Sequence, residues 1–192
     1  CFNEKQAIEH SSQIGFPLAM KVLSNQILHK TETGGVELNI KNLEELKTSF
    51  QKLSDVFQKL KMKSSNEKFL IQKMEKGIAE IILGYRVDEL VGPIVVLGSG
   101  GILSEIYNDK SIRMAPVDIT EAKKMIKEVK SLVTITGYRG LPGANINIIA
   151  NAIVKMSKLA FVKEIKEAEI NPVIVKKETQ GIIAVDGLIT LN

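Results

Sequence analysis

Cysteine and aromatic side chains are scarce in this chain of 192 residues. It contains one cysteine and no tryptophan, and aromatic residues make up 5% of it. A single cysteine excludes an internal disulfide and a cysteine-rich zinc site, and it favours a reducing, cytoplasmic compartment. With two histidines, His10 and His29, a histidine-based metal site is not expected either.

Long apolar runs are missing as well. The run at residues 94–97 falls far short of the ~20 residues that a helix needs to cross a bilayer, and no stretch near the N-terminus resembles a signal peptide. The chain opens at Cys1 rather than methionine, which fits a leading segment that the sequence does not include. With 44% hydrophobic and 25% charged residues, the composition indicates one folded domain or two small lobes that share a cleft.

Arginine is rare although the net charge is +4 and the isoelectric point is near 9.0. Arginine side chains read base edges in duplexes, and aromatic side chains stack on single strands. The scarcity of both disfavours nucleic acid as a partner. The lysines are mixed with 22 acidic residues, and we interpret most of them as a solvated surface.

Apolar periodicity predicts an α+β fold. Asn3 begins a short helix that ends at Gly15, and Asn42 with Glu45 fits the capping box of an amphipathic helix. The order of the expected strands and helices contains hairpins rather than regular βαβ units, which disfavours a Rossmann fold. The sequence also contains no P-loop string. The expected strands are 18–23, 36–40, 69–74, 79–87, 93–97, 168–175 and 182–188, and the longer helices are 42–60, about 118–130 and 145–161.

Two features of the strands have both a functional and a structural interpretation. Lys21 lies inside an apolar strand, where its ammonium either meets an anion or belongs to an edge strand and reaches water. Gly98, Ser99, Gly100 and Gly101 follow a strand, and such a loop either brings backbone N–H groups close to phosphate oxygens or simply forms a tight turn.

The C-terminal hairpin predicts a pair of oxygen-bearing side chains. If Val175 and Ile182 pair at the turn, counting back along both strands places Asn171 directly opposite Asp186, with Glu169 on the same face. Such a set of hard oxygen ligands suits Mg²⁺, although a hydrated polar sheet face has the same pattern. Pro172 cannot donate to the ladder, so its position must face outward or lie in a bulge.

Two arginines stand near glycine or proline. Arg113 precedes a proline by three residues, and Arg139 lies between Tyr138 and Gly140. Bidentate binding of a phosphate or carboxylate would explain guanidinium groups at these places, and a salt bridge to Asp or Glu would explain them equally well.

His29 precedes Lys30 in a loop between two expected strands. A neutral imidazole is a competent phosphoryl acceptor near pH 7, and the Lys30 cation would favour an approaching phosphate. A histidine that hydrogen-bonds the backbone and orders the turn is the alternative.

Taken together, these pieces resemble the ATP-grasp domain of ADP-forming acyl-CoA synthetases, of the beta-subunit type related to succinyl-CoA synthetase. The resemblance covers nearly the whole chain in order. The matching strings are GFPLAMK (15–21), ILHKTETGGV (27–36), GPI (92–94), GGI (100–102), Glu105, RMAP (113–116), GYRG (137–140), EINP (169–172) and VD (185–186).

The resemblance implies an ATP site between an N-terminal lobe, residues 1–74, and a C-terminal lobe, residues 75–192. Two departures from the family are Leu188, where a basic residue is usual, and Thr31-Glu32, where Ser-Asp is common. The nucleotide-binding residues implied by position are Lys21, Lys30, Gln72, Glu80, Gly100, Gly101 and Arg113, with Asn171 and Asp186 for Mg²⁺.

The family reaction converts acyl-CoA, ADP and phosphate to acid, CoA and ATP through an acyl phosphate and a phosphohistidine. It implies a CoA-binding alpha subunit or domain that carries the main phosphohistidine, and in some members a histidine at the position of His29 relays phosphate. Two other functions remain open: a nucleotide-sensing ATP-grasp domain linked to an acyltransferase, and a non-catalytic partner-binding domain.

Overall fold

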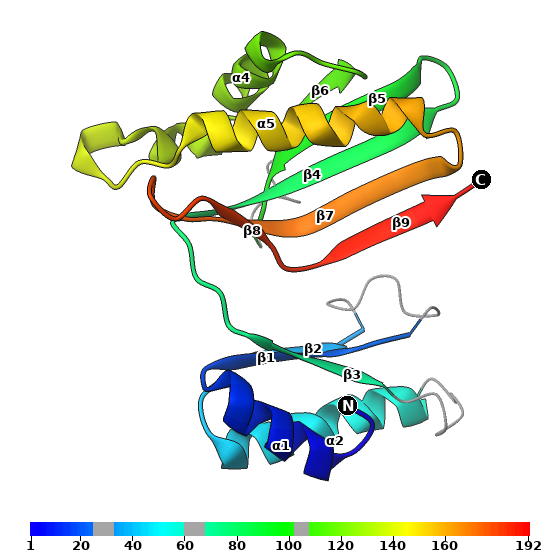
Figure 1. Ribbon diagram of the computed structural model, residues 1–192, viewed down its shortest axis with the longest axis vertical. Coiled ribbons are helices and arrows are strands. Elements are labelled where there is room, and N and C mark those ends of the chain that lie inside the picture. The colour runs from blue at the N-terminus through cyan, green and yellow to red at the C-terminus, as the bar shows by residue number, and fades with distance from the viewer. Residues whose placement is uncertain (25–32, 60–67, 102–107) are drawn as a thin grey trace. The chain divides into compact units, whose positions relative to one another are not determined.

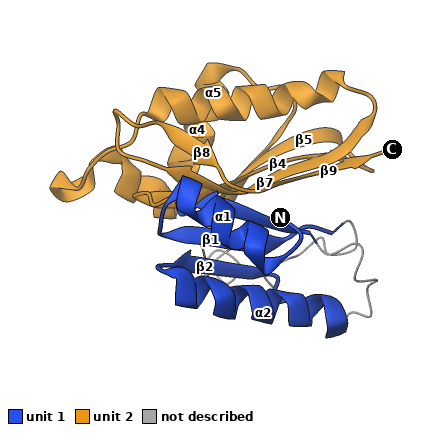
Figure 2. Ribbon diagram, turned by 60° about the horizontal axis from the view of Figure 1, so that its bottom comes forward, with its two compact units in different colours: residues 1–74 blue, residues 75–192 orange. Residues whose placement is uncertain are grey.

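The computed structural model describes residues 1–24, 33–59, 68–101 and 108–192. The chain divides into two compact units, Cys1–Met74 and Glu75–Asn192, which Figure 2 distinguishes by colour. Within the described residues, no helix combines the length and apolar character needed to cross a membrane.

The first unit packs two helices against a three-stranded antiparallel sheet. The sheet has the order β2-β1-β3, so β1 is its central strand. Leu18, Met20 and Val22 of β1 point toward the helices and are fully buried with Leu53 and Phe57. The elements are α1 (Glu4–Ile14), β1 (Leu18–Val22), β2 (Val36–Ile40), α2 (Leu43–Lys59) and β3 (Phe69–Lys73).

Both helices of this unit begin at side-chain caps. Asn3 accepts a hydrogen bond from the Gln6 amide. The Asn42 side chain accepts one from the Glu45 amide at 2.9 Å, while the Glu45 carboxylate accepts from the Lys41 amide at 2.8 Å. The predicted capping residue and its glutamate are therefore confirmed, and they satisfy amides that a helix start otherwise leaves unpaired.

The second unit contains a six-stranded antiparallel sheet with order β6-β5-β4-β7-β8, and β9 also pairs with β7. Helices α4 and α5 cover one face of this sheet (Figure 1). The elements are β4 (Ala79–Asp88), β5 (Gly92–Ser99), β6 (Lys110–Met114), α4 (Ile119–Glu128), η2 (Lys130–Thr136), η3 (Tyr138–Gly140), α5 (Ile146–Ser157), η4 (Lys158–Phe161), β7 (Ile165–Val175), β8 (Ile182–Ala184) and β9 (Gly187–Leu191).

The core of this unit separates the two faces of its sheet. Ile81 and Leu83 of β4 are buried against α4 and α5, together with Val95 and Leu97 of β5. Because side chains alternate along a strand, the residues between them point to the opposite side. We call that side the second face; its members include Glu80, Ile82, Gly84, Val96 and Glu169.

Several predicted bounds differ from the structure. The strand expected at 182–188 is interrupted at Val185 and Asp186, so it forms β8 and β9. Helix α5 ends at Ser157 and continues as the 3-10 turn η4, and η2 likewise follows α4. Strand β6 is not among the expected strands, because its five residues show little apolar alternation.

Candidate functional site

Asn171 and Asp186 lie opposite each other across the C-terminal hairpin. Val175 pairs with Ile182 at the turn, as predicted, and Ile170 pairs with Gly187 on the far side of the two residues. The Asn171 amide donates to the Asp186 carbonyl at 3.2 Å. The predicted register is thus confirmed on both sides of the pair.

A bulge accommodates Pro172. On β4 only Ile82 separates Ile81 from Leu83, whereas on β7 both Asn171 and Pro172 stand between the partners of those two residues. The extra residue in β7 removes the need for a ladder donor at the proline. One of the two arrangements predicted for Pro172 is therefore the observed one.

Glu169 orients the Asn171 amide. Glu169 pairs with Gly84 and so lies on the second face, and the Asn171 Nδ2 donates to Glu169 Oε1 at 3.1 Å. With its nitrogen directed at Glu169, the amide of Asn171 has its oxygen as the group that can accept or coordinate. Asp186 Oδ1 accepts a hydrogen bond from the Gly187 amide at 3.0 Å.

These side chains fit Mg²⁺ by their donor chemistry. Mg²⁺ is usually held by one or two carboxylates and keeps several waters or substrate phosphate oxygens. Among the described residues, no group of three His, Cys, Asp or Glu side chains is gathered tightly enough to enclose an ion without help. An amide oxygen with one or two carboxylates therefore suits a metal that arrives with a nucleotide, rather than a closed structural site.

Glu80 of β4 lies close to Gly100 and Gly101, the two glycines that directly follow β5. The Gly100 amide donates to the Glu80 carbonyl at 2.7 Å. A Cβ at Gly100 would lie 2.8 Å from the Glu80 Cβ, so only glycine permits this approach. The Gly100 amide is thus committed to the carbonyl of Glu80.

Lys21 and Gln72 lie on one side of the first unit's sheet. Lys21 is 5% exposed, on the central strand β1, where it pairs with Val36 of β2 and Leu70 of β3. Gln72 pairs with Ala19, two residues from Lys21, so both side chains point away from the helix-side core. The interpretation of Lys21 as an edge-strand lysine is wrong, because strands flank it on both sides.

Arg113 binds carboxylates of its own unit. Its Nε–H donates to Glu121 Oε1 at 2.6 Å and its Nη2 donates to Glu128, while Ser111 also donates to Glu128. These hydrogen bonds from Arg113 lower the pKa of both glutamates. The salt-bridge alternative therefore describes Arg113, which ties β6 to α4.

His29 and Lys30 lie outside the described residues, so the loop-histidine prediction is untested by the structure.

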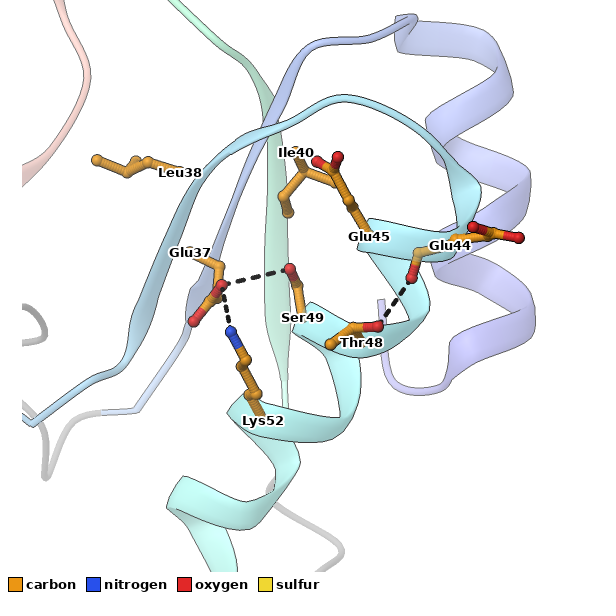
Figure 3. Close-up of a pocket in the computed structure, with 8 residues that line it drawn as sticks. All are labelled: Glu37, Leu38, Ile40, Glu44, Glu45, Thr48, Ser49 and Lys52. Atoms are coloured by element: carbon orange, nitrogen blue, oxygen red, sulfur yellow. Dashed lines mark hydrogen bonds and ion pairs between the residues drawn. The ribbon is translucent and has the colours of Figure 1, made fainter.

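A pocket that sequence reasoning did not find lies between β2 and α2 (Figure 3). Two of its three glutamates make contacts within the unit: Glu37 Oε2 lies 3.5 Å from Lys52 Nζ and accepts from Ser49, and Glu45 caps α2. None of the predicted site residues lines this pocket. We therefore assign it no part in the site.

Comparison with known proteins places these features in a family. A family model described as an ATP-grasp domain matches residues 1–191. The chain belongs to the ATP-grasp family. The α+β fold predicted from sequence is thus confirmed as an ATP-grasp fold with two lobes.

Relatives of this ATP-grasp domain include subunits and single long chains. It is 38% identical over 190 residues to the beta subunit of acetate–CoA ligase (ADP-forming) I from Pyrococcus furiosus, covering 98% of this chain and 81% of that one. It is 36% identical to 4-hydroxybutyrate–CoA ligase (ADP-forming) from Nitrosopumilus maritimus, covering 93% of this chain but 26% of that relative.

Solved structures agree with these sequence matches. A dinucleotide-forming acetyl-coenzyme A synthetase 1 from Ca. Korarchaeum cryptofilum, in complex with coenzyme A and Ca-AMPCP, matches with a TM-score of 0.84 and 33% identity. The match covers 99% of this ATP-grasp domain and 82% of that chain. A second structure of the same enzyme contains Mg-AMPPCP, with its phosphohistidine segment pointing towards the nucleotide-binding site, and matches with a TM-score of 0.78.

Proposed function

We propose that this ATP-grasp domain is the nucleotide-binding part of an ADP-forming acyl-CoA synthetase, acting on acetyl-CoA or a similar acyl-CoA. It exchanges a phosphoryl group between ATP or ADP and a phosphohistidine, and so couples acyl-CoA cleavage to ATP synthesis. The observation that carries the proposal is the Asn171–Asp186 pair beside Glu169 on the second face. It is supported by relatives named as ADP-forming acetate–CoA ligases.

The residues of the second unit have distinct roles in this proposal. Asn171 and Asp186 hold Mg²⁺, which neutralises negative charge on the transferred phosphoryl group when it is bound with the nucleotide. Glu169 fixes the amide of Asn171. Glu80 faces the nucleotide, with Gly100 and Gly101 determining where its carboxylate lies.

Lys21 and Gln72 are the proposed contributions of the first unit. The ammonium of Lys21, 5% exposed on the central strand β1, binds ATP phosphates, which is the role implied by its position in the family pattern. Gln72, half-buried on the same side of the sheet, is assigned to the adenine end of the nucleotide. We leave Arg113 out, since Glu121 and Glu128 engage its guanidinium.

His29 is proposed as a phosphoryl relay next to Lys30. A lone pair of the neutral imidazole forms a bond to the γ-phosphorus of ATP, the bond to the bridging oxygen breaks, and ADP leaves. The phosphoryl group then passes to a second histidine on a CoA-binding partner. The partner is proposed because similar proteins are named as beta subunits, and a similar structure has a phosphohistidine segment.

The test is incubation of the chain with γ-³²P-ATP and Mg²⁺, with and without the CoA-binding subunit from the same organism. We expect acid-labile, alkali-stable label on protein, and its loss when EDTA replaces Mg²⁺. Binding of MgATP with no transfer under either condition would favour the nucleotide-sensing function. The absence of MgATP binding would leave a partner-binding domain.

A further inference from the structure

Arg139 has a backbone conformation that its residue type rarely adopts. Its φ of 52° and ψ of 36° lie in the left-handed region. The other residues at positive φ in the described ranges, glycines apart, are Asn39 and Asn108, and asparagine tolerates this region. Residues held in such sparsely populated conformations occur most often at functional sites.

Backbone hydrogen bonds hold the surrounding loop, residues 137–141. The Gly140 amide donates to the Gly137 carbonyl at 3.3 Å, and the Leu141 amide donates to the Tyr138 carbonyl at 3.1 Å. Immediately after the loop, the Ala144 amide donates to the carbonyl of Ile135, whose side chain is fully buried. These hydrogen bonds constrain the backbone of the loop, so less conformational entropy is lost when the loop binds a partner.

The charge of Arg139 is not neutralised by the described parts of the chain. Arg86 Nη2 lies 3.2 Å from Asp88, and Arg113 binds Glu121 and Glu128. For Arg139, the contact found among the described residues is the Tyr138 ring, whose centroid lies 5.2 Å from the guanidinium carbon. Stacking orients a guanidinium and leaves its N–H groups for an outside acceptor.

The neighbours of Arg139 are apolar and exposed. Tyr138 is 47% exposed and Leu141 is 51% exposed, with exposed Pro142 beside them. A phosphate-binding site usually contains several hydrogen-bond donors. One arginine next to an aromatic and an aliphatic side chain is instead typical of a protein–protein contact. Tyrosine and arginine are also the residue types that dominate the energetics of such contacts.

We propose that Tyr138, Arg139 and Leu141 form a docking point for a protein partner that presents a carboxylate next to an apolar side chain. The uncompensated charge of Arg139 selects the carboxylate, and Tyr138 and Leu141 exclude water around the ion pair. This inference rests on the proposed function, because we assign the docking point to the CoA-binding subunit.

The experiment measures affinity for that subunit by biolayer interferometry, with the full chain immobilised. Arg139→Asn suits the left-handed backbone, so the variant should melt at the same temperature or higher. It should raise Kd for the subunit about tenfold or more. Arg86→Asn removes the same charge from the same unit and should change Kd by less than about twofold, since Asp88 already engages Arg86. MgATP affinity, measured by calorimetry, should stay unchanged in both variants.

Several results would overturn the inference: an unchanged Kd in Arg139→Asn, an equal loss in Arg86→Asn, or no complex with the wild-type chain. It would also be overturned if Arg139→Asn abolished binding of inorganic phosphate to the chain alone, or dissolved a dimer of the chain seen by sedimentation. An Arg139-dependent complex in a chain that binds no MgATP would support the docking point and refute the proposed function.

Discussion

At the scale of single residues, the carboxylate of Asp186 is the group on which the proposed Mg²⁺ dependence rests. We expect Asp186→Ala to abolish Mg²⁺-dependent ATP binding. Its side chain is only partly buried, so the melting temperature should change little. Calorimetric titration of ATP with Mg²⁺ and with EDTA measures the difference.

Glu167→Ala is the matched control for Asp186→Ala. Glu167 lies on the second face, two residues before Glu169 on the same strand, but outside the proposed donor set. Equal losses of Mg²⁺ dependence in the two variants would mean that general negative charge, and not a defined pair, attracts the metal.

Lys21 is the corresponding residue of the first unit. Lys21→Met should weaken MgATP binding about tenfold or more, because the phosphates lose a fixed cation. Urea unfolding should show a cooperative transition, so that the loss of affinity is assigned to the missing ammonium and not to an unfolded chain. Lys73→Met changes an exposed lysine of the same sheet and serves as the control. Normal ATP affinity in Lys21→Met would refute its role as a phosphate ligand.

At the scale of elements, the end of β5 is packed against the start of β4. In Gly100→Ala the new methyl would meet the Glu80 Cβ at 2.8 Å and its carbonyl carbon at 2.9 Å. The strand must therefore shift, and we expect a lower melting temperature together with weaker ATP binding. In Gly98→Ala, two residues earlier, the nearest atom would be at 3.9 Å, so both properties should be retained. Comparable melting temperatures for the two variants would contradict this packing argument.

The contact between β6 and α4 makes stability depend on pH. Hydrogen bonds from Arg113 lower the pKa of Glu121 and of Glu128 in the folded chain. Their contribution is therefore complete above the unfolded-state pKa of a glutamate and is lost as pH falls through the lowered folded-state pKa.

Urea titrations from neutral pH to about pH 3 test this contribution. Arg113→Met should make stability less dependent on pH in the acid range. Arg139→Asn removes an arginine that binds no carboxylate among the described residues, so its acid-range slope should match that of wild type. A wild-type slope in Arg113→Met would show that the ion pairs contribute nothing.

At the scale of the whole molecule, the proposed reaction needs phosphate to move from ATP to a partner. His29→Ala should remove alkali-stable label from this chain and slow labelling of the CoA-binding subunit. His10→Ala is the control, because His10 is an exposed residue of α1. Mass spectrometry under alkaline conditions locates the phosphate. Label retained in His29→Ala would leave that histidine with a structural role.

The sequence by itself determined those features that depend on neighbours along the chain. Helix caps at Asn3 and Asn42 involve residues three positions apart. The Asn171–Asp186 pair follows from counting back along a hairpin from its turn, and Pro172 required a bulge because it has no amide hydrogen. Short separations leave few alternative pairings, so local pattern was sufficient.

Only the tertiary structure decided what depends on distant residues. Lys21 lies in a central strand because β2 and β3, from two different later segments, pair on either side of it. Glu121 and Glu128 of α4 form ion pairs with the guanidinium of Arg113. Lys176 binds Glu75 at 2.5 Å, although the two residues are 101 positions apart in the sequence. Composition and spacing do not predict such partners. The packing of the sheet and its helices brings these residues together, and local sequence does not.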